Sequence, residues 1–218
     1  SPKLAQKITE EAPESKVYAV GQPSLEKWTE FFTSTVKEEV LNELGIDRTK
    51  PVILFLGGYG DNYAEVFDLF AQIAEEKKDV NVLVSLHSKG AGVLEKEILM
   101  QYDCEHVKLI KAGSYMDRII ACSTERAATI TDVFINWHSD TGMHATCIGR
   151  PVLYLDVENT DYSDIPLELG AIRVFEKDTA ISALDFLLEG GMSPPHGTND
   201  MPSNSIKRIA QLVLEKIK

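Results

Sequence analysis

The chain has 218 residues, of which 44% are hydrophobic and 26% charged. This balance is typical of a globular protein whose core is stable without disulfides or bound metals. Its net charge of -12, from 34 acidic against 22 basic residues, argues against a broad nucleic-acid surface, because such a surface needs clustered Lys and Arg. A small nucleotide pocket is still compatible with this charge, since a pocket binds through a few local donors.

The three cysteines, Cys104, Cys122 and Cys147, have no C-x-x-C spacing, which disfavours disulfides and a zinc site. We expect reduced, buried thiols in a cytoplasmic protein. No apolar run approaches the roughly 20 residues of a membrane span, and the first residues do not read as a signal peptide. Residues 1–15 are polar, and we expect a helical remnant or N-terminal extension there, followed by one domain over 16–218.

Apolar runs, helical spacing and Gly/Pro breaks define the elements. In chain order, we expect a strand over 16–20, a helix over 25–44, a strand over 52–56, a helix over 62–77, a strand over 80–86, a helix over 93–102, a strand over 107–110, a helical stretch over 121–128, a strand over 133–135, a helix over 141–148, strands over 152–155 and 172–175, a helix over 179–188, a loop over 190–203 and a helix over 205–217.

The alternation of strands and helices predicts an α/β fold, a Rossmann-like doubly wound parallel sheet of about six strands with helices on both faces. The run Val-Ile-Leu-Phe-Leu at 52–56 is apolar throughout, as expected for a strand covered on both faces.

Residues 127–156 are the most informative segment. A buried strand leads into a polar elbow at 136–140, which leads into a helix, and such an elbow places hydroxyls and backbone N–H groups where α/β proteins hold phosphates. Ser139, Thr141 and Gly142 are the candidate contacts. Asp140 fits an N-cap, and we expect its carboxylate to point away from a phosphate.

Glycines follow the strand at 52–56 directly. Gly57, Gly58 and Tyr59 form a loop where the backbone could approach a ligand closely, and a plain tight turn explains them about equally well. The motif is neither G-x-G-x-x-G nor a P-loop.

Two further loops end strands on the same expected edge. His87 follows the strand at 80–86, and Gly113, Ser114 and Tyr115 follow the strand at 107–110. A solvated connection explains His87 alone, and Tyr115 could stack on a base or cap the sheet. Four polar or glycine-rich loops on one edge together favour a ligand site along it.

His138 and His144 lie close in sequence. Further ligands at a suitable spacing are not visible, so we expect no metal. We expect both to hydrogen-bond in the nucleotide or diphosphate site, with plain surface exposure as the alternative for His144. There is no G-x-S-x-G nucleophile elbow, and the catalytic residues are left unassigned.

Three segments carry a family resemblance. Residues 17–23 (VYAVGQP) resemble the interdomain crossing of GT-B-fold glycosyltransferases, and 50–58 resemble the first strand and glycine loop of their C-terminal half. Residues 131–135 with 149–153 resemble the strand, elbow and G-x-P-V segment of that half. UDP-GlcNAc 2-epimerases and polymer-making glycerophosphotransferases share it, and the similarity extends over 16–188.

The resemblance implies a single GT-B-type half that holds a nucleotide diphosphate, with Gly57, Gly58 and the elbow 139–142 facing the diphosphate and 113–115 near the base. His144 stands where many relatives place a ribose-binding Glu. It also implies a missing N-terminal half or partner subunit that holds the acceptor.

We therefore expect a domain that binds a nucleotide sugar, UDP-linked, as the donor substrate of a glycosyltransferase, with no cofactor. Without its other half it should turn over little, because catalysis needs both halves to orient donor and acceptor. The alternatives are a 2-epimerase-like domain and a non-catalytic interaction module on the same fold.

Overall fold

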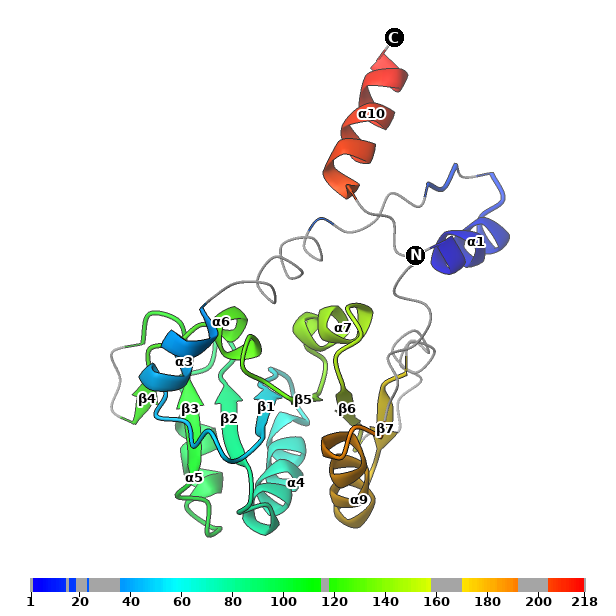
Figure 1. Ribbon diagram of the computed structural model, residues 1–218. Coiled ribbons are helices and arrows are strands. Elements are labelled where there is room, and N and C mark those ends of the chain that lie inside the picture. The colour runs from blue at the N-terminus through cyan, green and yellow to red at the C-terminus, as the bar shows by residue number, and fades with distance from the viewer. Residues whose placement is uncertain are drawn as a thin grey trace.

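The structure is a computed structural model that describes residues 2–14, 16–18, 23, 36–114, 118–157, 170–191 and 204–217. The strands are β1 (Val52–Leu56), β2 (Asn81–Ser85), β3 (Val107–Ile110), β4 (Ile119–Ile120), β5 (Val133–Asn136), β6 (Val152–Leu155) and β7 (Ile172–Val174). They form one sheet in the order β4-β3-β2-β1-β5-β6-β7, and every pair is parallel (Figure 1).

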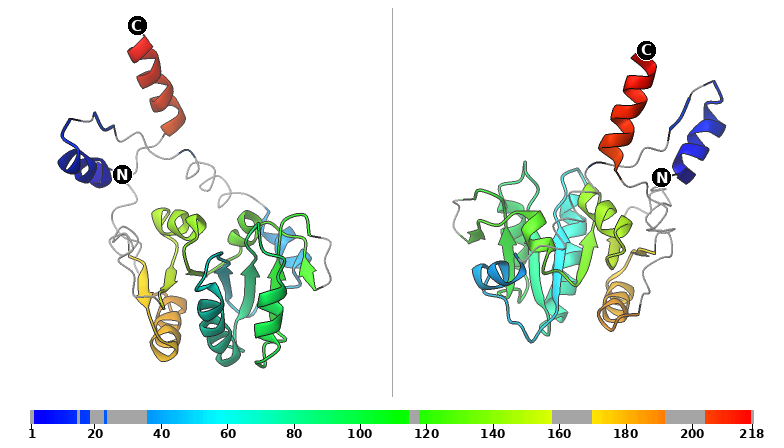
Figure 2. Two further views of the ribbon diagram at one scale, coloured as in Figure 1. Left: turned by 180° about the vertical axis from the view of Figure 1, so that it is seen from behind. Right: turned by 45° about the horizontal axis from the view of Figure 1, so that its top comes forward.

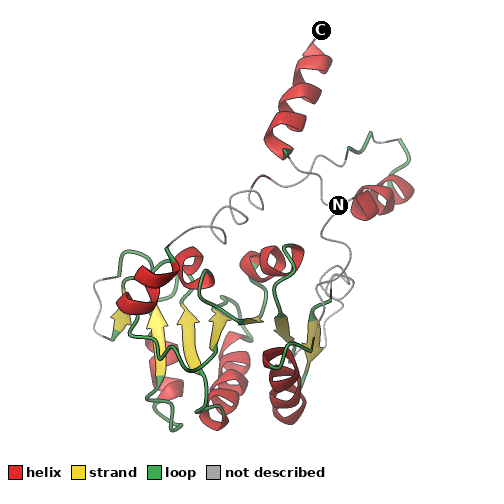
Figure 3. Ribbon diagram, in the orientation of Figure 1, coloured by secondary structure: helices red, strands yellow, loops and turns green. Residues whose placement is uncertain are grey.

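Helices cover both faces of this sheet (Figure 3). Their bounds are α1 (Pro2–Glu11), α3 (Lys37–Glu43), α4 (Tyr63–Glu76), α5 (Val93–Leu99), α6 (Thr124–Ala128), α7 (Asp140–Cys147), α9 (Lys177–Leu188) and α10 (Ser205–Ile217). Helices α4, α5 and α9 pack on one face, and α3, α6 and α7 pack on the other. Figure 2 shows α1 and α10 apart from the sheet and its helices.

The central strand β1 is apolar throughout because both of its faces are buried. Ile53 and Phe55 belong to the core under α4, α5 and α9, whereas Leu54 and Leu56 belong to the core under α3, α6 and α7. All four side chains are at most 1% exposed. Phe55 packs 4.3 Å from Phe70 of α4, measured between ring centroids. Both faces of β1 are therefore core, as the sequence predicts.

The direction of the strand order reverses beside β1. From β1 the chain proceeds outward through β2 and β3 to β4, then returns to pair β5 with the opposite side of β1. At such a switch point the loops that follow the two central strands diverge, and α/β proteins bind ligands there. The glycine loop after β1 and the elbow after β5 are these two loops.

Most elements expected on described residues are confirmed, with errors of a few residues at their ends. The helix expected over 25–44 is described only from residue 36, where α3 confirms its last part, and the loop expected over 190–203 lies outside the described residues except at 190–191. The sheet has seven strands against about six predicted, because the two-residue strand β4 was not expected. The helical stretch expected over 121–128 begins only at Thr124, as α6. The strand expected over 16–20 is wrong for its described part, since 16–18 are irregular, and residues 19–20 lie outside the described part.

The three cysteines are buried and free, as expected. Burial raises the pKa of the Cys104 and Cys122 thiols to about 11, so both are neutral and unreactive at neutral pH. Among the described residues, no helix combines the length and apolar character needed to cross a membrane.

Candidate functional site

The elbow after β5 is a short strand-to-helix turn. Trp137 leaves the strand, His138 adopts a left-handed backbone with φ of 56°, and Ser139 precedes the first residue of α7. Ser139 is the N-cap, because its Oγ accepts a hydrogen bond from Thr141 N at 3.3 Å. The N-cap expected at Asp140 is therefore wrong by one residue. Asp140 is the exposed first residue of the helix, where a carboxylate stabilises the helix dipole.

The elbow packs directly on the glycine loop. A Cβ added to Gly58 would lie 2.3 Å from Cε3 and 2.6 Å from Cζ3 of Trp137, whose side chain is buried. Gly57 is equally confined, because an added Cβ would lie 2.4 Å from the Ser85 carbonyl oxygen. Both glycines are thus required by neighbours within the protein, which explains them without any ligand.

A similar close approach occurs inside the elbow. An added Cβ at Gly142 would lie 2.1 Å from Cγ of Asn136, the last residue of β5. Among the described residues, Asn136 Oδ1 and Trp137 Nε1 are buried and have no hydrogen-bond partner. Buried polar atoms are normally paired, so both atoms need an explanation, as does His106 Nε2 before β3.

Tyr63 connects the region of the glycine loop to α5, the helix that follows β2. It begins α4, stacks on Trp137 at 5.7 Å between ring centroids, and donates a 2.9 Å hydrogen bond to Glu95 of α5. Glu95 is 4% exposed. Burial, followed by the adjacent Glu95 carboxylate, raises the pKa of the Tyr63 hydroxyl, so Tyr63 stays a neutral donor. This pair was missed in the sequence because its members are 32 residues apart.

An exposed aromatic group lies on the same loops. The Tyr59 side chain is 67% exposed and stacks on His87, with 5.6 Å between ring centroids. Lys89 Nζ lies 5.3 Å from the centre of the Tyr59 ring, within the range of a cation–π interaction. The predicted residues Tyr59 and His87 are therefore brought together.

The loop after β3 is connected to the loop after β2 by Lys111. Its Nζ donates to the carbonyl oxygens of Ser88 at 3.1 Å and Gly90 at 2.6 Å. Ser114 N donates to the Lys111 carbonyl oxygen at 3.3 Å, and Gly113 has a left-handed φ of 63°. The predicted residues Gly113 and Ser114 therefore end β3 on the same edge, and Tyr115 lies outside the described residues.

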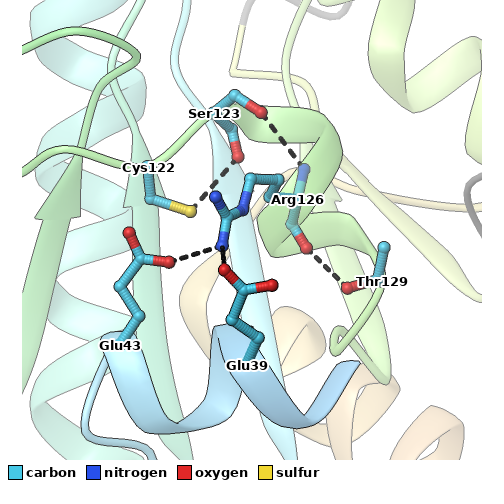
Figure 4. Close-up of polar contacts among 6 residues, drawn as sticks. All are labelled: Glu39, Glu43, Cys122, Ser123, Arg126 and Thr129. Carbon is cyan, nitrogen blue, oxygen red and sulfur yellow. Dashed lines mark hydrogen bonds and ion pairs between the residues drawn. The ribbon is translucent and has the colours of Figure 1, made fainter. Parts of the chain in front are cut away.

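Helix α6 begins close to the end of β2. Ser85 Oγ and Thr124 Oγ1 are 2.5 Å apart, and Ser123 caps the helix by accepting from Arg126 N. Figure 4 shows Arg126 between Glu39 and Glu43 of α3, which accept its hydrogen bonds at 3.3 and 2.6 Å. This ion-pair cluster holds α6 against α3 and so fixes where Ser123 and Thr124 lie.

His144 lies behind the elbow, on α7, and is 8% exposed. Burial lowers its pKa, and the Asp140 carboxylate one turn earlier acts in the opposite direction. The imidazole is therefore neutral at neutral pH. The surface exposure considered for His144 is wrong, and its hydrogen-bonding role stays a prediction.

The structure thus brings Gly57, Gly58, Tyr59, His87 and the elbow together around the β1–β5 switch point. Trp137, Tyr63 and Glu95 are the additional residues at this place. An aromatic residue next to a loop was the sequence signal for Trp137 and Tyr63, and Glu95 had none. No three His, Cys, Asp or Glu side chains are grouped as metal ligands in the described part of the chain.

No protein-family model matches the chain, and no curated protein matches it. Solved structures do. The UDP-GlcNAc 2-epimerase from Neisseria meningitidis, solved with UDP-GlcNAc bound, aligns with a TM-score of 0.70 and 16% identity, over 95% of this chain and 58% of that one. The ADP-heptose heptosyltransferase II of E. coli aligns with a TM-score of 0.56 and 14% identity, over 74% of this chain and 53% of that one.

The wall teichoic acid polymerase TagF aligns with a TM-score of 0.52 and 17% identity, over 87% of this chain and 48% of that one. The chain therefore spans about half the length of these proteins. Identities this low establish the fold alone. The chain has the fold of one half of GT-B-type enzymes, as the resemblance in its sequence implies.

Proposed function

We propose that the chain is the nucleotide-sugar-binding half of a glycosyltransferase and that its donor is UDP-linked. The observation that carries this proposal is the packing of the glycine loop on the elbow at the β1–β5 switch point. The bound UDP-GlcNAc in the similar N. meningitidis epimerase supports it.

In this proposal the diphosphate lies against the start of α7, next to Ser139 and Thr141. Helix N-termini attract anions through their N–H groups and dipole. Ser139 Oγ already accepts from Thr141 N, and Gly142 N donates to the Ser139 carbonyl oxygen at 3.0 Å. The Ser139 and Thr141 hydroxyls and the N–H groups of the elbow that precedes α7 are therefore the proposed donors.

The base would lie toward the ends of β2 and β3, near Gly113 and Ser114, and the ribose would lie near α7. Buried, neutral His144 can offer a hydrogen bond from the place where relatives have a Glu, with less strength than a carboxylate. Transfer itself would consist of orienting donor and acceptor while fixed N–H dipoles stabilise the departing diphosphate. The acceptor would be held by a second half or partner subunit, and the proposal needs no cofactor and no metal.

Calorimetric titration with UDP, CDP, GDP and inorganic phosphate tests the proposal. We expect UDP to bind more tightly than the other two nucleotides and phosphate alone to bind weakly. Gly113→Asp, an exposed change on the expected base side, should weaken UDP binding and leave phosphate binding unaltered. Failure of every nucleoside diphosphate to bind at millimolar concentration would exclude the site.

A 2-epimerase-like activity is the second candidate, because the N. meningitidis 2-epimerase aligns with a TM-score of 0.70. Incubation with UDP-GlcNAc in heavy water, followed by proton NMR, tests it. An epimerase exchanges the proton at C2 of the sugar for deuterium, whereas a donor-binding half leaves that proton in place.

An interaction module is the third candidate, and one observation favours it. The space beside Gly58 and Gly142 is filled by Trp137 and Asn136, and Tyr59 is exposed. A module of this kind would give no heat with any nucleotide and would bind a protein through the Tyr59 surface. The same titration therefore separates it from the donor-binding proposal.

A further inference from the structure

A continuous line of packed side chains crosses the switch point. His138 stacks on Trp137 with 4.2 Å between ring centroids, and Trp137 stacks on Tyr63 at 5.7 Å. Tyr63 then donates its hydrogen bond to Glu95. The line therefore joins the loops that follow β5, β1 and β2, three strands that come from distant parts of the sequence.

Trp137 is the member of the line that sets the spacing between loops. Its six-membered ring lies against the position of a Gly58 Cβ, and its Cη2 would lie 3.6 Å from a Cβ at Gly60. The side chain is 3% exposed, so protein atoms surround it on all sides. Interiors are packed densely enough that a smaller residue here would let the two loops approach one another.

His138 is the exposed end of the line. Its φ of 56° costs a residue with a side chain about 1 kcal/mol relative to glycine, so glycine would be the stable choice at this position. Strained non-glycine residues persist where the side chain is needed, and they concentrate at functional sites. The stack on Trp137 fixes where the imidazole lies, directly before the N-cap of α7.

We propose that the His138 imidazole contacts the bound diphosphate directly, and that Trp137 is the positioning residue that holds both His138 and the glycine loop for this contact. An imidazole offers at least one N–H donor, which suits a phosphate oxygen. The proposal rests on the proposed function, because it adds a residue to the same site. It assigns the strain at His138 to ligand binding, and the buried aromatic stack to the geometry of that binding.

Substitutions at His138 separate binding from stability. His138→Gly should keep Tm within about 3 °C of the unaltered protein, since glycine accepts this backbone. It should raise the Kd for UDP about 10-fold or more, as expected for the loss of a hydrogen bond to a charged group. His138→Asn tolerates the left-handed backbone and keeps a donor, so its Kd should fall between the two.

Substitutions at Trp137 test the positioning role. Trp137→Phe keeps a flat ring on Gly58 and should retain most of the affinity for UDP, whereas Trp137→Leu should lower the affinity further than its loss of Tm alone explains.

Trp137 fluorescence provides a second test. The chain has two tryptophans, so Trp28→Phe leaves Trp137 as the single fluorescent tryptophan. In that variant UDP should change the Trp137 fluorescence, a signal that a purely structural tryptophan would not give.

The outcomes separate the His138 contact and the Trp137 role from the proposed function. If the unaltered protein binds UDP and His138→Gly binds equally well, the contact is wrong and the proposed function stands. If UDP binds without changing the Trp137 fluorescence, or if Trp137→Leu retains full affinity, the positioning role is wrong. If no nucleoside diphosphate binds the unaltered protein, the proposed function and this inference both fail.

Discussion

The two edges of the sheet use polar groups differently. At the amino edge, Asn81 Nδ2 donates to the carbonyl oxygens of Asp47 at 2.8 Å and Lys50 at 3.0 Å, while its Oδ1 accepts from Asp47 N. Asp132 Oδ2 accepts from Val52 N at 2.8 Å. Each of these side chains satisfies backbone groups at the start of a strand, and its role is explained by the fold.

At the carboxyl edge, around the elbow, two buried side-chain atoms have no such role. Asn136 Oδ1 and Trp137 Nε1 are buried without a partner among the described residues, and His138 is strained. Protein interiors rarely retain such features unless function requires them. The amino edge has such features as well, since His106 Nε2 before β3 is buried without a partner and Arg118 before β4 has a φ of 61°. We expect ligand binding to depend on the carboxyl edge and stability alone to depend on the amino edge, and substitutions at each edge can test that distinction.

The largest effect on stability is expected at Gly142. Gly142→Ala places a Cβ 2.1 Å from Asn136 Cγ and should lower the free energy of unfolding by about 3 kcal/mol, measured by urea denaturation. Gly90→Ala is the matched control, because its Cβ meets its nearest atom, the His87 carbonyl oxygen, at 3.4 Å. Adding Asn136→Ala should restore part of the loss, and strict additivity of the two changes would contradict the packing explanation.

At the amino edge, Asn81→Ala should lower the free energy of unfolding by about 2 kcal/mol, because it removes several hydrogen bonds at once. UDP affinity should be unaltered when measured on the folded protein. Asn42→Ala, an exposed change, should stay within about 0.5 kcal/mol. A loss of UDP affinity in Asn81→Ala would erase the distinction between the edges.

Two N-caps provide a matched pair. Ser139 accepts from Thr141 N and Ser123 from Arg126 N, both at 3.3 Å, so Ser139→Ala and Ser123→Ala each remove one capping hydrogen bond and should each cost about 1 kcal/mol of stability in urea. Only Ser139 lies at the proposed diphosphate. A fall in UDP affinity for Ser139→Ala alone would sharpen the comparison, and equal falls for both would contradict it.

The smallest effect concerns pH. Burial lowers the pKa of folded His144, so between that value and about 6.5 the unfolded chain binds more protons. Stability should therefore decrease as the pH falls below about 6.5, by less than about 1.4 kcal/mol per pH unit for one such group.

His144→Gln should flatten this dependence in urea denaturation between pH 5 and 7.5. Burial also lowers the pKa of His106, so His106→Gln is the control for a histidine away from the elbow and should remove a separate part of the slope. An unchanged slope in His144→Gln would contradict the burial argument.

The elements were predictable because local patterns determine them. The continuous apolar run at β1 and the Gly-Arg-Pro turn before β6 are examples. Strand β4 was missed, since two isoleucines between loops carry no periodicity. The sequence could not explain why glycine is needed at positions 58 and 142, because the side chains that require it come close only in the folded protein. Trp137 is 79 positions from Gly58, and Asn136 belongs to a different element from Gly142.

The pairing of β1 with β5 also bears on how the chain folds. Ile53 lies beside Val133, so this contact closes a segment of about 80 residues, and such closures slow folding. The β1–β2 hydrogen bonds need only the first part of that segment. The glycine loop can therefore gain its Trp137 neighbour only after the whole intervening chain has been arranged. We expect pulsed hydrogen exchange to protect the β1 and β2 amides before those of β5, so that the switch point is among the last regions to mature.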